Sequence, residues 1–187
     1  MEDKSRGAIS PIGHPNLPII GGFILLTLVL GVTRLGFIPV PTEAKFATIM
    51  HLPTIIVCLV EGWPAGIIVG TVFGFTSMYM GITPMGADPI VSMVPRMLIG
   101  VTTYFAYTAT RGSNEYYRLG VGAVVGTLTN TVFYLGFSVL RGYLDSSVAF
   151  SIGLTHGLPE IIVAIIIVIP SVLLVRIIRN KINKYNY

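Results

Sequence analysis

A single arginine stands inside a strongly apolar stretch of this 187-residue chain, where residues 91–100 read VSMVPRMLIG. This residue, Arg96, directly follows Pro95. A guanidinium group is always charged and planar, and its N–H groups match the two oxygens of a carboxylate. An arginine in this setting could therefore bind an anionic ligand. It could equally pair with an acidic side chain such as Glu160 and join two helices, and the sequence leaves both alternatives open.

Other polar side chains in apolar stretches could act together with this arginine. His51 and Asn130 could each contact a ligand, or could hydrogen-bond to a neighbouring helix. His156 and Glu160 are four residues apart, so they share one face of a helix. Two such groups without a nearby third ligand do not make a metal site, and no nucleophile constellation accompanies them. We therefore expect neither a metal nor a cofactor, and no catalysis.

The composition indicates that these residues lie in a membrane. Hydrophobic residues make up 53% of the chain and charged residues only 11%, whereas soluble domains carry about 25% charged residues. Apolar stretches of about 18 residues or more are typical of membrane-spanning helices. The sequence predicts an all-α integral membrane protein, a bundle of six transmembrane helices forming one domain over residues 1–187, with spans at 17–35, 44–60, 64–80, 89–110, 119–140 and 156–178.

The basic residues predict how these helices are oriented, because lysine and arginine are enriched in cytoplasmic loops. With six spans both termini lie on one side. The side of the termini holds Lys4, Arg6, Arg111, Arg118, Arg176, Arg179, Lys181 and Lys184, and the other side holds Arg34, Lys45 and Arg141. We therefore predict that both termini are cytoplasmic and that loops 36–43, 81–88 and 141–155 face outward.

In this orientation the polar side chains gather in the outer half of the membrane. The residues concerned are His51, Thr76, Ser77, Tyr79, Arg96, Thr129, Asn130, His156 and Glu160. Pro53, Pro95 and Pro159 lie beside them, and a proline inside a helix frees the carbonyl four residues earlier. Ionisable groups and free carbonyls are tolerated at this depth where they line a cavity or are buried in protein. We expect a polar pocket that is open to the outside and closed below by apolar packing.

Four stretches, in order and spacing, resemble a known family. They read AKFATIMHLPTII, EGWPAGIIVGTVFGFTSM, DPIVSMVPRMLIG and GTLTNTVFYLG, and together they cover roughly residues 44–136. They are similar to the S components of energy-coupling factor (ECF) vitamin transporters, and most similar to the pantothenate type. In that type a TIH-like run opens the second span and an S-L-T-N-T run lies in the fifth. Met50 and Thr127 are small departures from these runs.

The resemblance implies a small six-helix protein of the prokaryotic cell membrane that captures a vitamin from outside. Its implied partners are a transmembrane T component and two cytoplasmic ABC ATPases, besides the lipid bilayer. A nucleic-acid partner is not expected, because the basic residues cluster at the ends of the apolar segments instead of forming a basic stripe. The chain has no G-x-x-x-x-G-K-[ST] motif, so any ATP would be hydrolysed by a partner. The family's lid loop would be residues 36–43. Thr27 and Gly31 stand where family members have a small-residue docking motif.

Pantothenate is a small anion with two hydroxyls and an amide, and the chain offers groups for each part. We expect Arg96 to bind the carboxylate, with Glu160 either pairing with it or contacting the ligand. The remaining candidates are polar partners or aromatic walls: His51, Ser92, Thr129, Asn130, Tyr79 and Tyr134. The same set could serve another vitamin of the cobalamin, folate or pyridoxine type. An autonomous channel or facilitator and an intramembrane enzyme are the alternatives from other classes.

Overall fold

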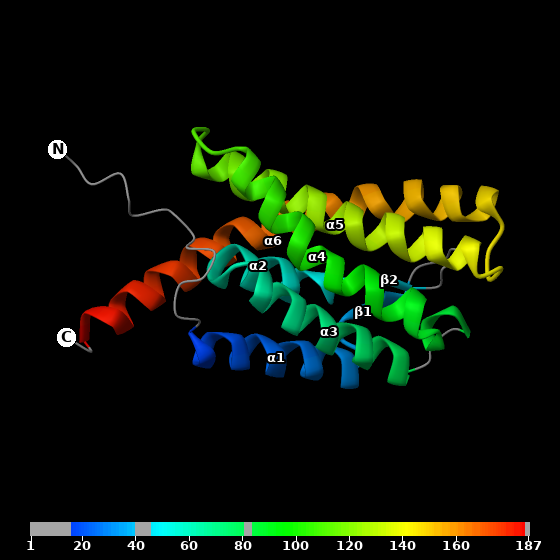
Figure 1. Ribbon diagram of the computed structural model, residues 1–187, viewed down its shortest axis with the longest axis horizontal. Helices are drawn as coiled ribbons and strands as arrows, with labels where there is room; N and C mark the ends of the chain where they lie inside the picture. Colours follow the sequence, from blue (N-terminus) through cyan, green and yellow to red (C-terminus); the bar gives the residue numbers. More distant parts are fainter. Residues whose placement is uncertain (1–15, 40–45, 81–83, 186–187) are drawn as a thin grey trace.

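The computed structural model describes residues 16–39, 46–80 and 84–185 of the chain. Its elements are α1 (Leu17–Val32), β1 (Phe37–Pro39), β2 (Phe46–Thr48), α2 (His51–Glu61), α3 (Trp63–Met80), the short 3₁₀ helix η1 (Pro84–Ala87), α4 (Pro89–Ala109), α5 (Glu115–Leu140) and α6 (Ser146–Tyr185). The helices run along the long axis of the molecule (Figure 1). The all-α prediction is confirmed, with six α-helices in the described residues.

Helix α2 lies at the centre of the bundle. Every residue from His51 to Val60 is buried, and α2 packs against α1, α3, α4, α5 and α6. Ile55 and Leu59 are among its fully buried side chains and join one continuous apolar core with α3, α4, α5 and α6. An 11-residue helix is too short to cross a membrane unaided, since a full crossing needs about 20 residues. Its position is therefore fixed by the longer helices around it.

Local sequence signals explain where several helices begin. Asn16 and Asn114 cap α1 and α5 by accepting hydrogen bonds from the amides of Ile19 and Tyr116. Gly62 forms the one-residue link between α2 and α3 with φ +94°, a conformation that L-residues other than glycine rarely adopt. Such short links make consecutive helices antiparallel neighbours.

Two of the predicted segments differ from the structure. The second was expected to begin at residue 44, but α2 begins at His51, and residues 46–48 form strand β2. Pro53 consequently lies in the first turn of α2, where the backbone N–H groups have no carbonyl partner within the helix. The expectation that this proline frees a carbonyl inside the helix is therefore wrong. The sixth segment, expected at 156–178, is a helix of 40 residues over Ser146–Tyr185.

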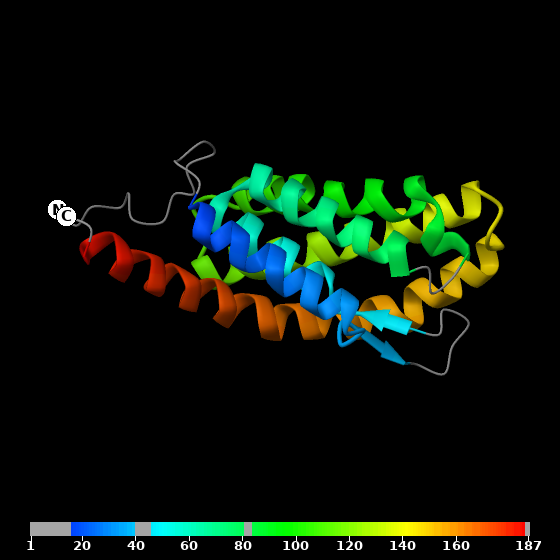
Figure 2. The same ribbon diagram turned by 90° about the horizontal axis from the view of Figure 1, so that it is seen from below.

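The strands form an antiparallel pair in which Phe37 faces Thr48 and Pro39 faces Phe46. This hairpin lies beside α6, and the C-terminal part of α6 extends beyond the ends of the other helices (Figure 2). The predicted lid, residues 36–43, overlaps β1 in part, and its residues 40–43 lie outside the described residues.

Three helices in the described part of the chain are long and apolar enough to cross a membrane, by length and composition: Pro89–Ala109, Glu115–Leu140 and Ser146–Arg179. The outward faces of the bundle are apolar, as expected for a surface in contact with lipid. Leu25, Phe105, Val132 and Ile166 are examples from four different helices, each at least 60% exposed.

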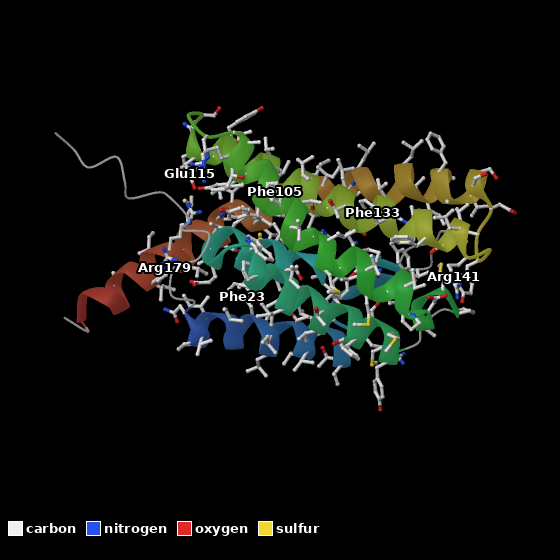
Figure 3. The ribbon with its side chains drawn as sticks, viewed as in Figure 1. Phe23, Phe105, Glu115, Phe133, Arg141 and Arg179 are labelled. Atoms are coloured by element: carbon white, nitrogen blue, oxygen red, sulfur yellow. The ribbon has the colours of Figure 1, made fainter. Side chains whose placement is uncertain are left out.

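Charged side chains gather at the two ends of the bundle. Figure 3 places Glu115 and Arg179 at one end and Arg141 at the other. At the first end two arginines of α6 cap α2, because Arg176 donates to the carbonyl of Leu59 over 2.8 Å and Arg179 to that of Val60 over 3.0 Å. Arg176 also pairs with Glu115, and Arg179 pairs with Glu61. The network ties α2, α5 and α6 together at the end where α1 begins (Figure 1).

The other end is joined by a second ion pair. Asp88 caps α4, with Oδ1 accepting from the amides of Ile90 and Val91. Its Oδ2 accepts from Arg141 Nε over 2.8 Å and from the Tyr143 hydroxyl over 3.1 Å. This pair therefore fastens the loop between α5 and α6 to the start of α4. The hydrogen bond from Arg141 holds the pKa of the Asp88 carboxyl below its ordinary value.

This contact predicts an acid-sensitive part of the protein's stability. Because the pKa of Asp88 is lower in the folded than in the unfolded chain, its contribution is complete above the unfolded pKa of about 4 and is lost as the pH falls through the folded pKa. Between about pH 5 and pH 3 we expect the thermal unfolding midpoint to fall less in Asp88→Asn than in the wild type. Asp145→Asn, which removes a carboxylate without a salt bridge in the described residues, should keep the wild-type slope. Parallel slopes for Asp88→Asn and wild type would refute this role.

Candidate ligand-binding site

Arg96 lies within α4 and is 4% exposed. Its guanidinium carbon lies 4.4 Å from the ring centroid of Tyr134 on α5 and 5.1 Å from that of Phe73 on α3. Both distances are within the range of cation–π attraction. The four salt bridges among the described residues do not include Arg96. The charge is thus held by aromatic rings and by the backbone.

The backbone contact comes from the proline beside it. Pro95 lies inside α4 and has no N–H to donate to the carbonyl of Val91, four residues earlier. That carbonyl accepts instead from Arg96 Nη1 over 2.7 Å. The sequence predicted that Pro95 frees the Val91 carbonyl, and in the structure this carbonyl accepts a hydrogen bond from the neighbouring arginine.

Helix α5 organises the rest of the polar cluster. Thr127, Asn130 and Tyr134 are spaced so that they share one face of this helix. The Thr127 hydroxyl lies 3.2 Å from His51 Nε2 on α2. The Nδ1 of His51 and the Oδ1 of Asn130 are both buried without a hydrogen-bond partner in the described residues. Buried polar atoms of this kind are uncommon, since leaving one unpaired costs about 1–3 kcal/mol.

Glu160 connects three elements around this cluster. Its Oε1 accepts from the amide of Thr48 on β2 over 3.0 Å, and its Oε2 accepts from the Thr131 hydroxyl on α5 over 3.3 Å. The carboxylate on α6 therefore holds the end of the hairpin against α5. No salt bridge joins it to Arg96, although both residues are described. A direct pair between them, one of the two alternatives left open by the sequence, is absent.

Three other predicted residues have different surroundings. The Ser92 hydroxyl is buried and donates to the carbonyl of Gly86 over 2.5 Å, which fastens η1 to α4. The Thr129 hydroxyl donates to the carbonyl of Val125 over 2.8 Å, and it lies 2.7 Å from the hydroxyl of Thr102 on α4. Tyr79 is 89% exposed on α3, so the structure does not bring it into the cluster. Exposure of this extent is unsuited to the wall of a pocket.

The sequence analysis did not predict two residues that contribute to the surroundings of Arg96 and Glu160. Phe73 lies in a glycine-rich apolar helix, where nothing in its neighbourhood distinguishes it from an ordinary packing residue. Thr48 takes part through its backbone amide, a group that every residue but proline has. Pro95, by contrast, could be recognised in the sequence because it directly precedes Arg96. It leaves free the carbonyl to which Arg96 donates.

The cluster presents a buried cation, two unpaired polar atoms and a carboxylate, surrounded by apolar helices. Groups of this kind can bind a small anion that also carries hydrogen-bonding groups. Fold and cluster together define a multi-pass membrane protein of the solute-binding class.

Comparison with known proteins identifies the class further. Residues 16–172 match the family described as "ECF transporter, substrate-specific component", and the chain belongs to this family. It is also 30% identical to the pantothenic acid transporter PanT of Lactococcus lactis subsp. cremoris (strain MG1363), over 145 aligned residues that cover 64% of this chain and 72% of the relative. The chain is therefore a non-catalytic, substrate-binding subunit that works with an energy-coupling module.

Proposed function

We propose that this subunit captures pantothenate from outside the cell. The observation that carries the proposal is Arg96, which is 4% exposed and forms none of the four salt bridges among the described residues. A buried charge without a counter-ion is costly, and an anionic ligand would supply one. The similarity to a pantothenic acid transporter points to the same kind of ligand.

The proposed roles follow the chemistry of each group. Arg96 binds the carboxylate, and the ring of Tyr134 forms part of the wall. The unpaired atoms of His51 and Asn130 serve the ligand's amide and hydroxyls. Glu160 can accept a hydrogen bond from a ligand hydroxyl in exchange for the one from Thr131. Ser92 and Thr129 contribute indirectly, because their hydroxyls already hold neighbouring segments in place.

We further propose the arrangement in the membrane. The energy-coupling module consists of a transmembrane T component and two cytoplasmic ABC ATPases, and both termini of this chain are cytoplasmic. The distribution of lysine and arginine supports this orientation. The end of the bundle that carries Arg176 and Arg179 then faces the cytoplasm, and the hairpin and the Asp88–Arg141 pair face outward. Thr27 and Gly31 are buried within the chain, so the T component would contact other residues of the surface.

Isothermal titration of the purified subunit in detergent, without partners, tests the proposal directly. We expect one pantothenate to bind per chain with a dissociation constant of about 1 μM or lower, equivalent to about −8 kcal/mol or more favourable. Cobalamin, folate and pyridoxine should give no heat at the same concentrations. Binding of one of these in place of pantothenate would refute the ligand assignment while leaving the transporter class intact. Flux of pantothenate through liposomes that contain this subunit alone would favour an autonomous facilitator.

A further inference from the structure

Pro95 lies one residue before Arg96, and its effect on the helix influences the orientation of the Arg96 guanidinium. With proline at this position no backbone amide competes for the Val91 carbonyl, and Arg96 Nη1 takes it over 2.7 Å. The guanidinium is therefore anchored to its own helix, one turn towards the N-terminus. An amide at position 95 would lie in line with the same carbonyl, as in any regular helix.

The two aromatic rings restrict the same group from other directions. The guanidinium carbon is 4.4 Å from the ring centroid of Tyr134 and 5.1 Å from that of Phe73. With Nη1 engaged, the end-on edge of the guanidinium, formed by its two Nη groups, is partly occupied. The lateral edge contains Nε, which is buried and has no hydrogen-bond partner in the described residues. A carboxylate can bind such an edge through both of its oxygens.

We propose that Pro95 is a positioning residue that makes this site selective for a carboxylate. By leaving the Val91 carbonyl free, it holds Arg96 so that the Nε edge, rather than the end of the side chain, faces the ligand's anionic group. This inference rests on the proposed function for the identity of the ligand. Its structural part, the anchoring of the guanidinium by the freed carbonyl, is independent of which anion binds.

The substitution Pro95→Ala tests the proposal because it restores the amide and changes little else. A helix interior tolerates alanine better than proline, so we expect the thermal midpoint to stay at or above that of the wild type. Pantothenate should nevertheless bind at least about tenfold more weakly, the effect of losing one well-placed charge-assisted hydrogen bond. Pantothenol, the analogue with an alcohol in place of the carboxylate, should bind equally to both proteins.

A matched control is present in the same chain. Pro170 also lies inside a helix, α6, and is exposed on the surface of the bundle. Pro170→Ala makes the same backbone change away from Arg96, and we expect it to leave the affinity for pantothenate unchanged. If Pro170→Ala weakened binding as much as Pro95→Ala, or if Pro95→Ala weakened pantothenate and pantothenol equally, the selective role of Pro95 would be refuted.

A spectroscopic measurement separates this proposal from the proposed function. In protein labelled with ¹⁵N-arginine, an anchored guanidinium rotates slowly and gives separate Nη1 and Nη2 signals. We expect Arg96, assigned with Arg96→Ala, to give separate signals in the wild type and averaged signals in Pro95→Ala, with no ligand present. Identical signals in both proteins would overturn the positioning role. Separate signals in a wild type that does not bind pantothenate would support the positioning role and refute only the ligand.

Discussion

Replacing Arg96 by alanine should weaken pantothenate binding by about 30-fold or more, because truncating one partner of a buried, hydrogen-bonded charge pair costs about 2–5 kcal/mol. The arginine supplies the positive charge of the cluster, and none of the four salt bridges among the described residues includes it. Without it, the ligand's carboxylate would meet no cation in the cluster, while the Glu160 carboxylate would remain. Titration calorimetry in detergent measures the loss directly.

The same substitution should not unfold the protein. Arg96 is buried, so the folded state bears the cost of removing its charge from water. Arg96→Met removes the charge while nearly preserving side-chain volume, and we expect its thermal midpoint to equal or exceed that of the wild type. Arg111→Ala, which removes an exposed arginine, should bind normally. Wild-type affinity in a folded Arg96→Ala protein would eliminate Arg96 from the site.

The sequence carried enough information for the fold class and for the centre of the candidate site. Long apolar segments separated by turn residues predicted the helices, because a chain in lipid must satisfy its backbone hydrogen bonds within each helix. Arg96 stood out as an ionisable residue in such a segment. The proline beside it predicted a free carbonyl at Val91. The structure adds that Arg96 itself donates a hydrogen bond to this carbonyl.

The features that could not be predicted depend on packing and on short-range pairing. The run FATIM, residues 46–50, is apolar in the same way as the start of a helix, so periodicity could not separate strand β2 from α2. Residue type and depth suggested Tyr79 as a ligand contact, and Ser92 was suggested because it lies four residues before Arg96, on the same helix face. Side-chain direction decides otherwise, because Tyr79 points outward and the Ser92 hydroxyl is used by η1.

Replacing Gly70 by alanine should destabilise the protein and displace Arg96 at the same time. A Cβ atom on Gly70 would lie 2.1 Å from the carbonyl oxygen of Arg96, 2.9 Å from its carbonyl carbon and 3.3 Å from Cγ2 of Thr54. The first two atoms belong to the backbone of α4 and cannot rotate away, so α3 and α4 would have to separate. Small residues at helix contacts in membranes permit this close approach. We expect a loss of about 3 kcal/mol in the free energy of unfolding, at the upper end for overpacking.

Gly136→Ala is the matched control, because a Cβ atom there would meet nothing within 4 Å. Alanine is a better helix former than glycine by about 1 kcal/mol, so this variant should be as stable as the wild type or slightly more stable. Thermal unfolding in detergent compares the two variants, and titration with pantothenate should show weakened binding only for Gly70→Ala. Equal midpoints for both variants would contradict the close contact between α3 and α4. A destabilised Gly70→Ala protein that still binds normally while folded would show that the position of Arg96 does not depend on this contact.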